Sequence, residues 1–78
     1  MSEQPQANQS EYLVTVHTII KKSDIDYVYV FKKYIMGPET YDIYAHLKNE
    51  KDVVLVTDLN YGQISQHIQT IANQLTGV

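Results

Sequence analysis

The chain has 78 residues, which limits it to one domain at most, and a formal net charge of −3 with six lysines and no arginine. This balance argues against a dedicated duplex-DNA binder, which normally presents a face rich in arginine and lysine. Cysteine is absent, so disulfide bonds and thiolate metal sites are excluded. A core this small usually needs a further source of stability, and we favour oligomerisation.

The first ten residues, MSEQPQANQS, contain no hydrophobic residue besides Met1 and Ala7. Because so polar a segment cannot contribute to a core, we expect a disordered tail over residues 1–10 and a single domain over residues 11–78. The amino terminus shows no signal-peptide apolar region, and no apolar run approaches the roughly 18 residues of a membrane span. We therefore expect a cytoplasmic protein.

Residues 11–21, EYLVTVHTIIK, are the first segment with a periodic pattern. Six β-branched residues occupy the seven positions from Val14 to Ile20. Such residues lose side-chain freedom in a helix and pack well on a pleated surface, so this segment is predicted to be a strand. The polar run that follows, residues 22–26, predicts a loop of about five residues.

Residues 27–35, YVYVFKKYI, predict an inner strand of an antiparallel sheet. Its two faces differ: one carries Tyr27, Tyr29, Phe31 and Lys33, and the other carries Val28, Val30, Lys32 and Tyr34. Gly37 and Pro38 end the strand, because glycine permits a positive φ and proline cannot donate to a sheet.

Residues 41–48, YDIYAHLK, alternate cleanly between apolar and polar side chains. Tyr41, Ile43, Ala45 and Leu47 form one face, and Asp42, Tyr44, His46 and Lys48 form the other. This alternation predicts a strand with one side against a core. After a charged turn, residues 53–57, VVLVT, predict a short buried strand.

The carboxy-terminal segment carries the only convincing helical pattern. Its apolar stripe consists of Ile64, Ile68, Ile71 and Leu75, with Ala72 beside them. Asn60 is the favoured amino-terminal cap, with Asp58 as the alternative, and Gly77 is placed to end the helix. No side chain after Asp58 carries a formal charge, so the helix has to rely on packing of its stripe.

Loops of about five, five and four residues between the strands imply neighbours that run antiparallel. We therefore predict an α+β fold, in which a four-stranded antiparallel β-meander is followed by one C-terminal α-helix packed on one sheet face. A single helix can cover only one side of such a sheet, so the other side remains for a further role.

Catalytic chemistry has little support in the sequence. Most carboxylates fall in predicted turns, and no phosphate-binding loop or nucleophile motif occurs. His46 and Asp42 share a strand face and could pair as base and orienter, but polar side chains on an exposed strand are the simpler interpretation. The three histidines lack the spacing of a metal-ligand pair. We expect no enzymatic activity, no metal and no cofactor.

The sheet surface is the candidate functional site. Opposite its apolar face, the strand at residues 41–48 presents Tyr44, His46 and Lys48, and the neighbouring strand adds one of its own two faces. The pattern leaves the choice between these two faces open. The face with Tyr27, Tyr29, Phe31 and Lys33 is the more informative of the two. The candidate interaction surface then consists of Tyr27, Tyr29, Phe31, Lys33, Tyr44, His46 and Lys48.

Two functions suit such a surface. Protein interfaces favour tyrosine and phenylalanine, whereas aromatic residues interleaved with lysine can also stack on the bases of a single strand. Because the net charge is negative, we favour a small non-enzymatic protein-interaction module of the regulator or inhibitor type. We expect a homodimer held through the open sheet face, with an unidentified protein partner possible and no membrane partner. The alternative is a single-stranded nucleic-acid-binding protein using the aromatic/lysine sheet face.

Overall fold

The computed structural model describes residues 11–33 and 37–77 of the chain. The elements in chain order are β1 (Tyr12–Val14), β2 (Ile19–Lys21), the short 3₁₀ helix η2 (Lys22–Asp24), β3 (Ile25–Lys33), β4 (Thr40–Leu47), β5 (Asp52–Leu59) and α1 (Tyr61–Thr76). The expectation of a disordered tail over residues 1–10 lies outside the described residues.

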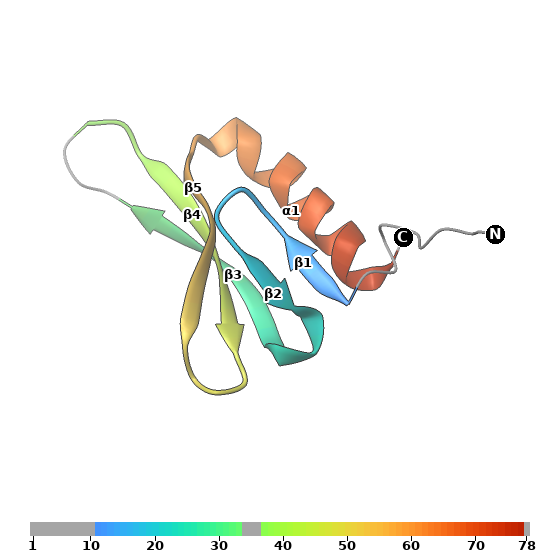
Figure 1. Cartoon of the computed structure of the whole chain (residues 1–78). Helices are drawn as coiled ribbons and strands as arrows, with labels where there is room; N and C mark the ends of the chain where they lie inside the picture. The colour runs from blue at the N-terminus through green and yellow to red at the C-terminus, as the bar shows by residue number, and fades with distance from the viewer. Residues whose placement is uncertain (1–10, 34–36, 78) are drawn as a thin grey trace.

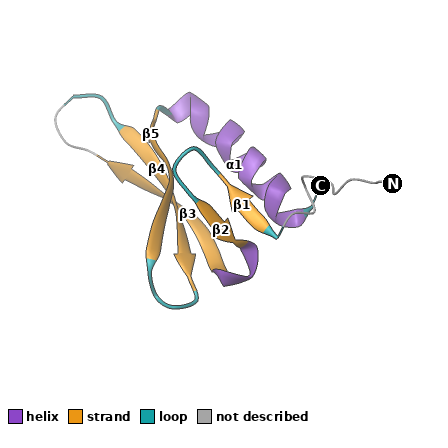
Figure 2. Cartoon of the chain, viewed as in Figure 1, coloured by secondary structure: helices purple, strands orange, loops and turns teal. Residues whose placement is uncertain are grey.

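The strands form two separate antiparallel units. β3, β4 and β5 make a three-stranded meander with β4 in the centre, and β1 pairs with β2 in a two-stranded hairpin. The hairpin and α1 lie next to each other on one side of the meander (Figure 1, Figure 2). The predicted α+β class, with antiparallel strands followed by one C-terminal helix, is therefore confirmed.

The prediction of one strand over residues 11–21 is wrong, because the chain turns back on itself in the middle of this segment. The backbone N–H of Thr15 donates to the carbonyl oxygen of Thr18 over 2.9 Å. The Thr15 hydroxyl oxygen also accepts the N–H groups of His17 and Thr18, each over 3.3 Å. A threonine hydroxyl that bonds the local backbone in this way competes with an extended strand. The meander consequently has three strands, and the segment predicted as the first strand, residues 11–21, forms a hairpin of its own.

Other element boundaries lie close to the predicted ones. β3 begins at Ile25, two residues before the predicted start at Tyr27, because the expected loop is shortened to the 3₁₀ turn η2. The predicted end of this strand, at residue 35, lies outside the described residues. β4 ends one residue earlier than the strand predicted over residues 41–48, and β5 includes the strand predicted over residues 53–57.

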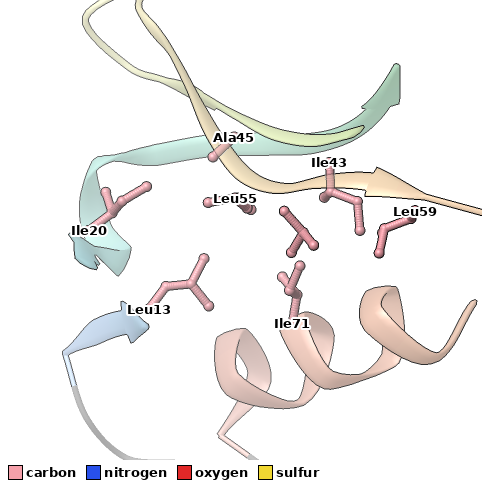
Figure 3. Close-up of a cluster of buried hydrophobic side chains, with 8 residues drawn as sticks. Leu13, Ile20, Ile43, Ala45, Leu55, Leu59 and Ile71 are labelled. Atoms are coloured by element: carbon pink, nitrogen blue, oxygen red, sulfur yellow. The ribbon is translucent and has the colours of Figure 1, made fainter. Parts of the chain in front are cut away.

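The core lies between the meander on one side and the hairpin and helix on the other (Figure 3). Leu13 of β1 and Ile71 of α1 point toward the sheet, where Ile43 of β4 is fully buried. The predicted apolar face of β4 is thereby confirmed as the core side. The buried hydrophobic residues are Leu13, Ile20, Ile43, Ala45, Leu55, Val56, Leu59 and Ile71.

The helix begins and ends where the sequence predicts. The Asn60 side chain accepts the backbone N–H of Gln63, and the Gln63 side chain accepts the backbone N–H of Asn60, both over 3.0 Å. This reciprocal capping box satisfies two N–H groups that an uncapped helix leaves unbonded. Gly77 follows the helix with φ 77°, the left-handed conformation that glycine adopts without a side-chain clash.

Two side-chain contacts attach the hairpin to the rest of the domain. The side-chain amide of Gln74 on α1 bonds the backbone of Val14 on β1. Its oxygen accepts the Val14 N–H over 3.1 Å, and its nitrogen donates to the Val14 carbonyl oxygen over 3.0 Å. The amide therefore bonds β1 as a neighbouring strand would. In the adjoining hairpin turn, Nε2 of His17 lies 3.3 Å from the Thr57 hydroxyl of β5.

Candidate interaction surface

The open face is the side of the β3-β4-β5 sheet that faces away from α1 and the hairpin. In the β3–β4 register, Val28 is opposite Ala45 and Val30 is opposite Ile43, which places these valines on the core side. Because neighbouring residues of a strand point to opposite faces, the tyrosine side of β3 belongs to the open face. The structure thus answers the choice between the two faces of this strand.

Five residues form a continuous aromatic cluster on the open face. Tyr27 stacks on His46 with ring centroids 4.8 Å apart and planes 21° apart, and Tyr29 stacks on Tyr44 at 5.5 Å and 12°. Phe31 meets Tyr44 edge-on at 6.2 Å, and Tyr27 lies 6.0 Å from Tyr29. The aromatic cluster therefore crosses two strands, with each ring in contact with another.

Two of these rings are half exposed although their neighbours shield them. Tyr27 is 52% exposed and Phe31 is 50% exposed, whereas Tyr29, Tyr44 and His46 are half-buried. In each stacked pair, one flat face of each ring is covered by its partner. Rings in this arrangement present apolar area together with hydrogen-bonding groups.

His46 is held by carboxylates on both ring nitrogens. Its Nδ1 lies 2.8 Å from Oδ1 of Asp52 on β5, and its Nε2 lies 3.3 Å from Oε1 of Glu50 in the β4–β5 turn. The hydrogen bond to Asp52 is the main reason that the pKa of His46 is raised above its ordinary value, against the opposing effect of partial burial. Partial burial and the nearby Asp52 carboxylate also raise the pKa of Tyr29.

Lys33, at the far end of β3, is bound by two further carboxylates. Its Nζ lies 2.6 Å from Oδ1 of Asp58 and 3.3 Å from Oδ1 of Asp42. The hydrogen bond to Asp58 is the largest of the effects that raise the pKa of Lys33 above its ordinary value. Asp42 is only 4% exposed, and its Oδ1 also accepts the backbone N–H of Asp58 over 3.0 Å. This buried carboxylate therefore fixes the backbone of β5 where Asp58 has a φ of 59°.

The structure brings five of the seven predicted surface residues into the aromatic cluster. Lys33 lies on the same face, next to Asp42 and Asp58 and not among the rings. Lys48 falls outside β4, in the turn, where its backbone N–H donates to the carbonyl of Asp24. The lysine is therefore not part of the strand surface.

Sequence reasoning missed the carboxylates that surround the two cations. Asp52 was assigned to a charged turn, but it pairs with His46 across the sheet. Asp58 lies near the end of β5 and Glu50 lies in the β4–β5 turn, and both have a positive φ. Glu50 reaches His46 from four residues along the chain, whereas Asp52 reaches it through the register of β4 against β5, which includes two irregularities. No local pattern in the sequence reports that register.

Other parts of the described chain offer less. A hollow of about 420 Å³ runs along the start of α1, but its lining residues all come from the helix, so no second element closes it: Tyr61, Gly62, Ile64, Ser65 and Ile68. Among residues 11–33 and 37–77, no group of three or more histidine and acidic side chains is arranged to hold a metal ion. Over the same residues, no helix is both long enough and apolar enough to cross a bilayer.

Comparisons of the chain with protein-family models, with curated protein sequences and with solved structures find no match.

Proposed function

We propose that the protein is a non-enzymatic protein-interaction module and that the open face of its sheet is the contact surface. The observation that carries this proposal is the aromatic cluster, in which Tyr27 and Phe31 remain half exposed beside three half-buried rings. Tyrosine and phenylalanine are enriched at protein interfaces, where large rings bury apolar area and the phenol hydroxyls still find partners.

The electrostatics of the open face favour a protein over a nucleic acid. Lys33 and His46 are its cationic side chains within the described residues, and each is bound to two carboxylates. A single-strand binder combines a positively charged groove with aromatic faces on which bases stack. Here the cations are neutralised and the stacked rings share their faces. Both features support a protein partner and weaken the nucleic-acid alternative.

The same carboxylates suggest the chemistry of the partner. Asp52 is half exposed and Glu50 is highly exposed, so they border the aromatic cluster with negative charge. Complementary charge at the rim of an interface increases the association rate and excludes partners of like charge. We therefore expect a partner surface with an apolar or aromatic centre and lysine or arginine at its edge, bound in the manner of a regulator or inhibitor.

A retention experiment with two matched variants tests this proposal. Phe31→Ser removes a half-exposed ring from the open face, and Val16→Ser removes an 84% exposed side chain from the hairpin turn. The immobilised wild-type chain and the Val16→Ser variant should retain the same protein from an extract of the source cells. The Phe31→Ser variant should lose it. Equal retention by all three would show that the open face is not the contact surface.

A nuclease arm separates the two functions. Retention that disappears after nuclease treatment, together with direct binding of an oligothymidylate by the purified chain, would favour single-strand binding instead. We expect retention to survive nuclease treatment and the oligonucleotide to remain unbound at micromolar protein concentration.

A further inference from the structure

β3 is an edge strand that nothing in the described structure pairs on its outer side. The sheet order is β3-β4-β5, so β4 occupies one side of β3 and the other side is an edge over all nine residues from Ile25 to Lys33. Half of the backbone N–H and C=O groups of such a strand point away from the sheet. Proteins normally protect edges with charges, proline or bulges. In β3 a β-bulge lies between Ile25 and Tyr27, and the following residues 27–31, YVYVF, carry no charge and no proline.

The sequence of β3 is complementary to that of a second β3 strand that runs antiparallel to it. Around Tyr29 as the centre, Tyr27 corresponds to Phe31 and Val28 to Val30. One step further out, the exposed acid Asp26 corresponds to the exposed base Lys32. In this register, two antiparallel copies of β3 would pair aromatic residues with aromatic residues and valine with valine. They would also pair an acidic residue with a basic one. All of these are favourable cross-strand pairs.

Other two-fold registers lose this complementarity. Directly opposed residues in an antiparallel pair lie on the same face, so the two-fold axis has to pass through a residue and not between residues. Centring the axis on Val28 places Asp26 opposite a valine, and centring it on Val30 places Lys32 opposite a valine. Only the axis at Tyr29 places Asp26 opposite Lys32. It also gives every residue of β3 a counterpart, with Ile25 opposite Lys33 and the β-bulge between Ile25 and Tyr27 at the end of the paired segment.

We infer that a second copy of this chain pairs with the β3 edge, in the antiparallel register centred on Tyr29. This inference deepens the proposed function, on which it rests, because it joins two open faces into one surface. The two sheets become one continuous six-stranded sheet with a two-fold axis perpendicular to it. The aromatic clusters of both copies then lie side by side on the same face of that sheet.

The area of the joined surface also supports this inference. A strand of nine residues is about 30 Å long, and three strands span about 15 Å, which gives roughly 450 Å² of sheet per copy. A specific protein interface usually needs about 800 Å² from each partner. One open face is therefore small for a stable contact, and two open faces joined at β3 approach the usual size.

A charge-reversal cycle tests the register. Each single substitution, Asp26→Lys or Lys32→Asp, places two like charges across the dimer interface, and the two-fold symmetry repeats this pair. Each should therefore weaken the dimer by about tenfold or more. The double variant restores opposite charges and should recover the dimer. Sedimentation equilibrium reads the result against the monomer mass of 9.0 kDa. Glu11→Lys and Lys51→Asp, which change exposed charges outside β3, are the matched controls and should leave the mass unchanged.

Disulfide trapping gives an independent readout, since the chain has no cysteine of its own. In the inferred register, residue 29 lies opposite itself with Cα atoms about 5 Å apart, which is within the range of a disulfide bond. Tyr29→Cys should therefore form a covalent dimer on mild oxidation. Tyr27→Cys alone should not, because its counterpart is displaced by four residues, but it should cross-link in a mixture with Phe31→Cys.

The possible results distinguish this inference from the proposed function. A wild-type chain that sediments at 9.0 kDa throughout the micromolar range overturns the inference but leaves partner binding by the open face intact. A stable dimer that ignores the charge reversals and does not cross-link at residue 29 overturns the β3 register in favour of another interface. Loss of partner retention in Phe31→Ser, with the dimer preserved, supports both.

Discussion

The two faces of the β3-β4-β5 sheet are built from the same strands but differ in what their side chains contact. On the core side, Ile43 and Ala45 are completely buried by residues of the hairpin and the helix. On the open face, Tyr44 and His46 alternate with them along β4 and contact other rings and carboxylates. The comparison shows that one face of this sheet forms the core of the domain, whereas the side chains of the other contact one another outside that core.

The same contrast applies to the edges of the two small sheets. The outer edge of β1 is bonded by the Gln74 amide at Val14, so its backbone groups there have partners within the chain. Within the described residues, the outer edge of β3 has no such partner strand or side-chain bridge. Protection of the short edge and exposure of the long one agree with a role for β3 in association.

The largest expected effect is a loss of stability when a buried side chain of the core is truncated. Ile71 is 4% exposed and lies at the centre of the helical stripe, so Ile71→Ala should lower the free energy of unfolding by about 2–4 kcal/mol. Ile68 is only half-buried, and its change to alanine should cost less. Urea denaturation measures both, with exposed Gln66→Ala as the control, expected within about 0.5 kcal/mol of wild type. Equal midpoints for Ile71→Ala and Gln66→Ala would mean that the stripe does not form the core.

A smaller effect concerns Asp42, the one buried charged side chain among residues 11–33 and 37–77. Asp42→Ala removes the acceptor of the Asp58 N–H and one of two partners of Lys33. We expect a loss of about 1–3 kcal/mol, because the part-buried N–H of Asp58 is left without this bond. Asp24→Ala, at an exposed position in η2, is the control. Thermal unfolding compares the two, and a neutral Asp42→Ala would contradict the role of this carboxylate in fixing β5.

The smallest effect is a dependence of stability on pH. Bonding to Asp52 raises the pKa of His46 above 6.5, so the folded chain binds this proton more tightly than the unfolded chain does. The resulting stabilisation is complete below the unfolded pKa and is lost as the pH rises through the folded pKa. The melting temperature of wild type relative to His46→Gln should therefore fall from pH 6 toward pH 8. A constant difference would show that the two carboxylates do not stabilise the imidazolium.

Much of this arrangement could be predicted from the sequence, and the reasons are local. Alternation along β4 identifies its core side, and the spacing of Ile64, Ile68, Ile71 and Leu75 identifies the buried face of α1. Asn60 and Gly77 mark the helix ends, because their side-chain and backbone properties act within one turn. These features depend on neighbours in sequence, so a pattern can report them.

The remainder depends on contacts between distant residues. The run of β-branched residues around Thr15 favours a continuous strand, and the turn there forms together with burial of Leu13 and Ile20 against the sheet. The carboxylate partners of Lys33 and His46 follow from strand register and from positive φ at Glu50 and Asp58. Neither the register nor these backbone conformations has a signature in the sequence.

Amide hydrogen exchange along β3 tests most directly whether this strand serves association. If a second copy pairs with the outer edge, the amides from Asp26 to Lys33 should all be protected at high protein concentration. Dilution below the dissociation constant should leave protection only at every second residue, where the N–H points toward β4. Alternating protection at every concentration throughout the micromolar range would contradict the account.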